Sequence, residues 1–142
     1  MIGIANAHAR TRRRDVVTSL KFISVLAAIA ATTTVAFAAS SVATVDTAKG
    51  QVLAGDNGMT LYTFKKDAAD VSNCYDKCAA NWPPFIAKAD AVAGGAYSIV
   101  TRKDGGRQWA KDGKPLYYWV KDSRKGDITG DGVMGVWDLA RP

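Results

Sequence analysis

The chain has 142 residues and a formal net charge of +6, and its acidic residues are all aspartate. Its only histidine, His8, lies near the N-terminus, so the chain beyond it has neither imidazole nor glutamate. A Ser-His-Asp triad, a Cys-His pair and a His-ligated zinc site are therefore excluded there, because each needs histidine. A non-enzymatic role is favoured, and catalysis would have to use Asp, Lys, Tyr or Cys.

Residues 1–38 predict a cleavable signal peptide, and hence a secreted or periplasmic protein. Five basic residues precede an apolar stretch, residues 22–35, and Ala36-Phe37-Ala38 forms a small-x-small cleavage site. The alternative is an uncleaved N-terminal anchor, the one case in which a membrane would be a partner. Cleavage would leave residues 39–142 with 14 Lys and Arg against 12 Asp, a net charge of +2. Both signs are interspersed, so no nucleic-acid partner is expected.

The first half of the exported part predicts short strands. Strands are expected at residues 42–45, 51–54 and 60–64, the last two joined by a hairpin turn at Asn57-Gly58. Ser72 can cap a short helix over residues 74–80, and Pro83-Pro84 then blocks helix and central strand alike. Further strands are expected at residues 85–87 and 97–102.

The second half repeats this pattern, with strands expected at residues 107–110, 116–120 and 133–139 and a turn at Asp112-Gly113. We therefore predict one small, mainly β domain, residues 39–142, built from two related β-hairpin repeats. The repeat units span about residues 50–83 and 105–138, and one short helix carries the CxxxC motif.

A motif recurs at an offset of 55 residues: LYTFKKD at 61–67 returns as LYYWVKD at 116–122. Side chains alternate along a strand, so Tyr62 and Phe64 share one face, as do Tyr117 and Trp119. Leu61 and Leu116 then face the other way. The aspartates that end the motifs, Asp67 and Asp122, are expected to accept hydrogen bonds from turn amides.

Tryptophans repeat at the same offset, Trp82 and Trp137. Aromatic side chains of this kind most simply fill a core. The alternative is a pseudo-symmetric ligand pocket lined by Tyr62, Trp82, Tyr117 and Trp137, which would suit a planar, sugar or quinone-like ligand.

Cys74 and Cys78 are the only cysteines. In an exported protein such a pair predicts a disulfide, and at i, i+4 on a helix the two side chains share a face within bridging range. The closed loop is so short that it would add only about 2 kcal/mol of stability. A redox-active pair and a copper(I) site with Met59 or Met134 are the alternatives, the latter because soft sulfur suits that ion.

A calcium-loop pattern covers residues 127–138. Asp127, Thr129, Asp131 and Asp138 occupy positions 1, 3, 5 and 12, with Gly132 at position 6. Aspartate stands where the bidentate glutamate is usual, and no flanking helices are evident, so a glycine-rich turn is the favoured interpretation. No cofactor is predicted beyond this possible calcium ion.

Four segments together carry a family resemblance: LYTFKKD, SNCYDKCAANWPP, RKDGGRQWAKDGKPLYYWVKD and GDITGDGVMGVWDL. In order and spacing they resemble the bacterial secreted-repeat family, predicted lipoproteins with a Y-x-[FWY]-x-x-D motif, from about residue 50 to 142. The resemblance implies an exported β-rich domain and no established reaction. The leader lacks cysteine, so this member departs from the family's lipoprotein character.

Three functional hypotheses follow. The first is a non-enzymatic exported domain that binds a small ligand or a protein partner at the cell envelope. The second is a redox or electron-transfer accessory module that uses Cys74 and Cys78. The third is an enzyme that uses Asp67 or Asp122 together with tyrosines.

Overall fold

The computed structural model describes residues 42–142, so the predicted signal peptide lies outside the described residues. The elements in chain order are β1 (Ala43–Thr47), β2 (Gly50–Ala54), β3 (Tyr62–Phe64), α1 (Lys77–Asn81), β4 (Tyr97–Thr101), β5 (Arg107–Lys111), β6 (Lys114–Pro115), the 3-10 turn η1 (Val133–Gly135) and β7 (Trp137–Leu139). The predicted mainly β fold with one short helix is confirmed. In the part of the chain described, no helix is long and apolar enough to cross a membrane.

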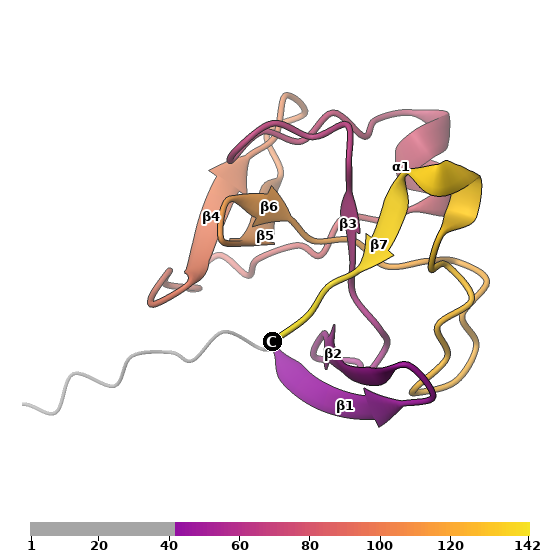
Figure 1. The fold of residues 1–142 in the computed structure, drawn as a ribbon. Helices are drawn as coiled ribbons and strands as arrows, with labels where there is room; N and C mark the ends of the chain where they lie inside the picture. The colour runs from indigo at the N-terminus through magenta and orange to yellow at the C-terminus, as the bar shows by residue number, and fades with distance from the viewer. Residues whose placement is uncertain (1–41) are drawn as a thin grey trace, which may run out of the picture. The chain divides into compact units, whose positions relative to one another are not determined.

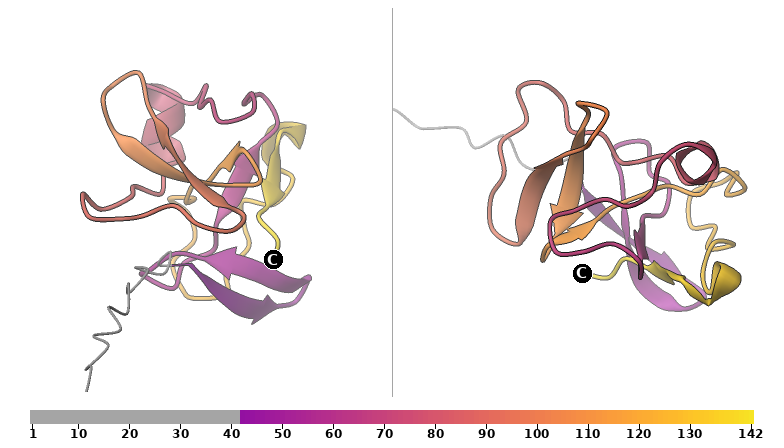
Figure 2. Two further views of the ribbon diagram at one scale, coloured as in Figure 1. Left: turned by 90° about the vertical axis from the view of Figure 1, so that its left-hand side faces the viewer. Right: turned by 90° about the horizontal axis from the view of Figure 1, so that it is seen from above.

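The strands form three small antiparallel sheets, which Figure 1 shows. β1 pairs with β2, and β5 pairs with both β4 and β6. The third sheet joins β3 to β7, segments that lie far apart in the sequence and side by side in the fold (Figures 1 and 2). The last strand of the chain therefore pairs with a strand of the first repeat.

The link between β5 and β6 shows why the local sequence folds this way. Asp112 and Gly113 have φ angles of 49° and 74°, and they separate the paired residues Lys111 and Lys114. Two central residues with positive φ define the hairpin turn whose twist matches that of the flanking strands, and Asp-Gly is a preferred sequence for it.

The two repeats meet at Tyr62 and Tyr117, which stand 55 residues apart. The amide of Tyr62 donates to the carbonyl of Tyr117 at 2.8 Å, and the amide of Tyr117 donates back at 3.0 Å. This reciprocal pair lies at the centre of a pseudo-two-fold arrangement, because each tyrosine holds the same place in its own repeat.

The closing segment of each repeat pairs with the other repeat. In β7, Leu139 lies opposite Tyr62. The equivalent segment of the first repeat pairs with the second repeat in the same way. Pro84 forms a β-bridge with Tyr117, and the amide of Tyr118 donates to the carbonyl of Pro83 at 2.8 Å. Each repeat is therefore completed by a segment of the other.

Side chains separate into two cores as the alternation predicts. Tyr62, Phe64, Tyr117 and Trp119 belong to one cluster, which also holds Trp82 and Trp137. Leu61, Leu116 and Tyr118 belong to the second, around Phe85 and Trp109. The predicted faces of the two motifs are thus confirmed.

Several predicted elements are corrected. The turn at Asn57-Gly58 forms, but the strand that follows it pairs mainly with β7, and β2 takes β1 as its hairpin partner. The strand predicted at 116–120 is wrong, because β6 ends at Pro115 and Tyr117 makes only isolated bridges. Likewise, the strand predicted at 85–87 reduces to a single bridge between Ile86 and Gln108.

The strand predicted at 133–139 begins only at Trp137. Before it, Gly132, Met134 and Gly135 all have positive φ angles, 75°, 51° and 69°. Extended strand geometry requires negative φ, so the backbone turns through η1 there instead.

The helix is also shorter than predicted. It begins at Lys77 and not at residue 74, its N-cap is Asp76, and no side chain caps it. The predicted cap by Ser72 is wrong, because its hydroxyl bonds Tyr117 at 2.8 Å and Arg102 at 2.9 Å.

Candidate functional site

Four aromatic rings lie face to face in one continuous row, here called the aromatic stack. The central pair is Trp82 and Trp137, with ring centroids 3.8 Å apart and planes 7° from parallel. Phe64 stacks on the outer face of Trp137 at 4.4 Å, and Trp119 stacks on the outer face of Trp82 at 4.0 Å. Stacked aromatic pairs each contribute about 0.5–1.5 kcal/mol beyond their burial.

The stack follows from the repeat and from the exchange of closing segments. Phe64 and Trp119 hold the same place in their motifs, as do Trp82 and Trp137 at the end of each repeat. Pairing of β3 with β7 sets Phe64 directly opposite Trp137. The same exchange in the other direction sets Trp119 beside Trp82, so each outer ring stacks on a tryptophan from the other repeat.

Two buried tyrosines brace the central tryptophans from the side. Tyr62 meets Trp82 edge-on at 5.3 Å, and Tyr117 meets Trp137 edge-on at 5.2 Å. Both tyrosines are fully buried, so they hold the position of the stack and do not reach solvent.

The tyrosine hydroxyls bond the motif aspartates crosswise. Tyr62 donates to Asp122 at 2.6 Å, and Tyr117 donates to Asp67 at 2.8 Å. Each tyrosine therefore bonds the aspartate of the other repeat. The aspartates also accept turn amides as predicted, Asp67 from Asn73 at 2.7 Å and Asp122 from Thr129 at 3.0 Å.

Burial and hydrogen bonding shift the pKa values of the two tyrosines and of Asp67. Burial, and then the bond to Asp122, raises the pKa of Tyr62 far above its usual range. Burial likewise raises the pKa of Tyr117 strongly. Burial also raises the pKa of Asp67, against the opposing effects of its bonds from Asn73 and Tyr117. Both tyrosines are therefore neutral hydrogen-bond donors near neutral pH.

The disulfide between Cys74 and Cys78 is confirmed, with α-carbons 5.2 Å apart. It does not lie wholly on the helix as predicted, because Cys74 precedes α1. Cys74 is fully buried in the same cluster as the aromatic stack. The bridge thus ties the start of α1 to the core beside the stack.

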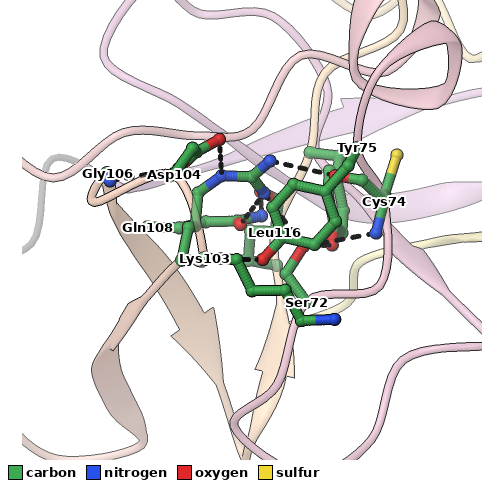
Figure 3. A network of polar contacts seen from close by, with 10 residues as sticks. Ser72, Cys74, Tyr75, Lys103, Asp104, Gly106, Gln108 and Leu116 are labelled. Atoms are coloured by element: carbon green, nitrogen blue, oxygen red, sulfur yellow. Dashed lines mark hydrogen bonds and ion pairs between the residues drawn. The ribbon is translucent and has the colours of Figure 1, made fainter.

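A buried arginine, Arg102, holds the segment around Cys74. Figure 3 shows this network of contacts, with the partners Ser72, Cys74 and Gln108 labelled. Arg102, only 4% exposed, donates to the carbonyl of Cys74 at 2.9 Å and to Gln108 at 2.7 Å. Its guanidinium also lies 4.5 Å from the centre of the Tyr75 ring. This network of charge-assisted bonds fixes the cysteine segment against β4 and β5.

An open groove of about 440 Å³ runs along the aromatic stack and is here called the aromatic groove. The four stacked rings form part of its wall, together with Val133, Val136 and Met134. Cys78 and Asn81 of α1 also line it, as do three lysines, Lys66, Lys77 and Lys121. Apolar and aromatic walls with a few polar groups are typical of small-molecule sites.

Met134 forms an unusual part of this wall. The residue is 84% exposed, and its backbone φ is 51°. A non-glycine residue in that region costs about 1–3 kcal/mol and persists where the surroundings impose it. The strained turn presents a flexible, polarisable side chain that can adapt to the shape of a ligand.

The predicted pocket residues divide between core and groove. Tyr62, Trp82, Tyr117 and Trp137 do contact one another in pairs, but the two tyrosines are buried behind the stack. Trp82 and Trp137 line the groove with little exposed surface, 4% and 2%. Sequence reasoning missed Trp119 as a groove residue, although its place in the motif matches that of Phe64.

The calcium pattern finds no geometric support. Thr129 donates to Asp122 at 2.6 Å, Asp131 pairs with Lys49 at 2.6 Å, and Asp138 pairs with Lys65 at 3.1 Å. The fourth residue, Asp127, accepts backbone amides of its own turn. Across residues 42–142, no three acidic, cysteine or histidine side chains gather closely enough to hold a metal ion.

The copper(I) hypothesis requires free thiols, which the bridge between Cys74 and Cys78 removes. These are the only two cysteines of the chain. A thiolate site could therefore arise only after reduction of the disulfide.

Two β repeats that exchange their closing segments around one shared aromatic stack define a small two-repeat β module. The chain belongs to the family described as the secreted repeat of unknown function (Lipoprotein_15), whose model matches residues 43–86 and 98–141. The family resemblance is thus confirmed, and the matched repeats extend beyond the predicted units at both ends. Neither the curated proteins nor the solved structures give a significant match to the chain.

Proposed function

We propose that this chain is an exported, non-enzymatic binding module of the cell envelope that holds a small molecule with a flat ring system in the aromatic groove. The observation that carries the proposal is the aromatic stack open to a groove of about 440 Å³. A flat ligand can continue the row of rings, since aromatic faces favour offset stacking on one another.

The rigidity of the wall supports binding. The rings are fixed by stacking on one another, by edge-on tyrosines and by the disulfide at Cys78. A preformed site loses little conformational entropy when a ligand enters, which favours affinity. Met134 adds one adaptable element to this rigid surface.

Matched fragments test the proposal. Naphthalene-2-sulfonamide is flat, and cyclohexanesulfonamide carries the same polar group on a puckered ring. In an NMR titration of the oxidised protein, we expect the flat fragment alone to shift the indole signals of Trp82, Trp119 and Trp137. Trp119→Leu should weaken this binding, whereas Val120→Ala, a change at the exposed neighbouring residue outside the groove, should not.

Equal binding of both fragments would contradict the proposal, as would shifts confined to Trp109. Trp109 is a suitable internal reference because it lies in the second core.

A thiol–disulfide role is the second candidate, favoured by one observation: Cys78 lines the aromatic groove. A bound redox-active molecule would therefore lie beside the bridge. The reduction potential decides between the two roles, because structural disulfides of secreted proteins lie below about −300 mV and labile ones lie higher. A potential near that of thiol-exchanging proteins, about −120 to −270 mV, would favour the redox role.

A further inference from the structure

We infer that the ligand of the aromatic groove is a planar aromatic anion, a flat ring system carrying a sulfonate, carboxylate or phosphate group. This inference rests on the proposed function and adds the charge of the ligand to it. It is carried by the lysines of the groove.

Three lysines line the aromatic groove, Lys66, Lys77 and Lys121, and no acidic residue lines it with them. All three side chains are exposed. Within residues 42–142, none of them forms an ion pair, whereas Lys49, Lys65, Lys88 and Lys111 each pair with an aspartate. The groove therefore concentrates positive charge beside its aromatic wall on a part of the chain whose net charge is only +2.

The repeat places two of these lysines equivalently. Lys66 and Lys121 each lie two residues after the outer ring of the stack and one before the motif aspartate. The neighbouring Asp67 and Asp122 do not line the groove, and their carboxylates bond tyrosines. The motif thus directs its carboxylate to a buried tyrosine of the other repeat and its lysine to the groove.

Trp119 and Lys121 lie together at the wall of the groove. The Lys121 ammonium lies 5.6 Å from the centre of the Trp119 ring, so an anion on a ligand stacked against the wall would lie within its reach. In addition, the indole Nε1–H of Trp119 is shielded and donates to no acceptor among the described residues. An unpaired buried donor is unfavourable, so an acceptor oxygen that reached this N–H group would stabilise the complex.

Charge selectivity is measured with an isosteric pair, naphthalene-2-sulfonate and the neutral naphthalene-2-sulfonamide, titrated into the disulfide-bonded protein at low salt. A single ion pair at a solvated surface is weak, but the three lysines act together on one anion. We expect the anion to bind about tenfold more tightly than the amide. The preference should shrink at about 1 M salt, where the screening length falls to about 3 Å.

The lysine assignment is tested by replacing all three groove lysines with glutamine. The matched control replaces three exposed lysines outside the groove, Lys88, Lys103 and Lys125, with glutamine. We expect the groove variant to bind both naphthalenes with similar affinity and the control to keep the full preference. Circular dichroism confirms that each variant is folded, which the exposed positions favour.

Equal binding of the two compounds to the wild type would overturn the inference and leave the proposed function standing. A preference that survives in the groove variant would overturn the assignment to these lysines. Binding of neither compound would overturn the proposed function itself, and the inference with it.

Discussion

The hydroxyl of Tyr62, in the first repeat, forms hydrogen bonds with residues of the second repeat. It donates to Asp122 at 2.6 Å and accepts the amide of Gly130 at 3.2 Å, while its ring braces Trp82. Tyr117 plays the equivalent part with Asp67 and Trp137. A tyrosine and an aspartate at fixed places in a short motif thus link two repeats crosswise.

Removing one of these hydroxyls should cost measurable stability. Tyr62→Phe and Tyr117→Phe keep the ring but leave a carboxylate with one donor fewer, buried Asp122 or half-buried Asp67. Each should therefore lower the free energy of unfolding by about 1–3 kcal/mol. Tyr118→Phe is the matched control, because its hydroxyl makes only a long contact, 3.4 Å, with exposed Asp56. Chemical denaturation measures all three; losses no larger than the control's would refute the structural role of the crossed bonds.

Alkaline pH should unfold the protein through the same tyrosines. Burial raises the pKa of Tyr62, Tyr117 and Tyr118 above the ordinary value of 10.0. Above pH 10 the unfolded chain releases these protons and the folded chain retains them, so the free energy of unfolding falls as the pH rises. Tyrosinate absorbance and circular dichroism, followed together, should show three of the five tyrosines ionising only as the fold is lost. Early ionisation of all five in a folded protein would contradict this.

At the scale of elements, the segment before η1 sets the position of the stack. Gly130 packs so closely that a β-carbon there would lie 2.8 Å from the Trp82 ring and 2.9 Å from the Tyr62 ring. Both rings are held by several partners and cannot yield freely. The glycine-rich loop thus has a packing role at this point, which fits its interpretation as a glycine-rich turn.

Gly130→Ala should therefore be disruptive despite its small size. Overpacking a rigid site costs about 1–3 kcal/mol, and the displaced ring should also weaken binding in the aromatic groove. Gly94→Ala is the control, because a β-carbon there meets nothing within 4 Å. Thermal melts and the naphthalene titration measure the two effects. Equal melting temperatures for both variants would show that the contact at Gly130 is not restrictive.

At the scale of the whole molecule, the exchange of closing segments makes the repeats interdependent. Cutting the exposed loop between Ala93 and Gly94 separates one repeat from the other, and each piece then lacks the segment that completes it. We expect residues 39–93 and 94–142 each to be unfolded alone and to assemble into a one-to-one complex when mixed. Circular dichroism with analytical ultracentrifugation tests this, and a fragment that folds by itself would contradict the exchange.

The exchange of closing segments between the repeats is the part of the fold that the sequence could not predict. The offset of 55 residues indicated two copies, and the alternation along LYTFKKD and LYYWVKD correctly assigned the two faces. Turn signals, however, report only neighbours in the chain, so they predicted local hairpins and not the pairing of β3 with β7. The stack was missed for the same reason, since Trp119 meets Trp82 only through that exchange.

The starts of the helix and of the final strand were predicted wrongly because the local sequence does not signal what determines them. Ser72 has the chemistry of a cap, but Arg102 and Tyr117 take its hydroxyl, and both come from the second half of the chain. Positive φ at Met134 was equally beyond prediction, because methionine has no preference for that conformation.

The most direct test of the aromatic groove follows the four indole N–H signals of the protein while naphthalene-2-sulfonate is added. Three of the four tryptophans form the stack, and Trp109 lies apart in the second core. We expect saturable shifts of the Trp82, Trp119 and Trp137 signals, largest for Trp119, with the Trp109 signal unchanged. Unchanged signals at all four positions, or shifts of Trp109 alone, would contradict a binding site on the aromatic stack.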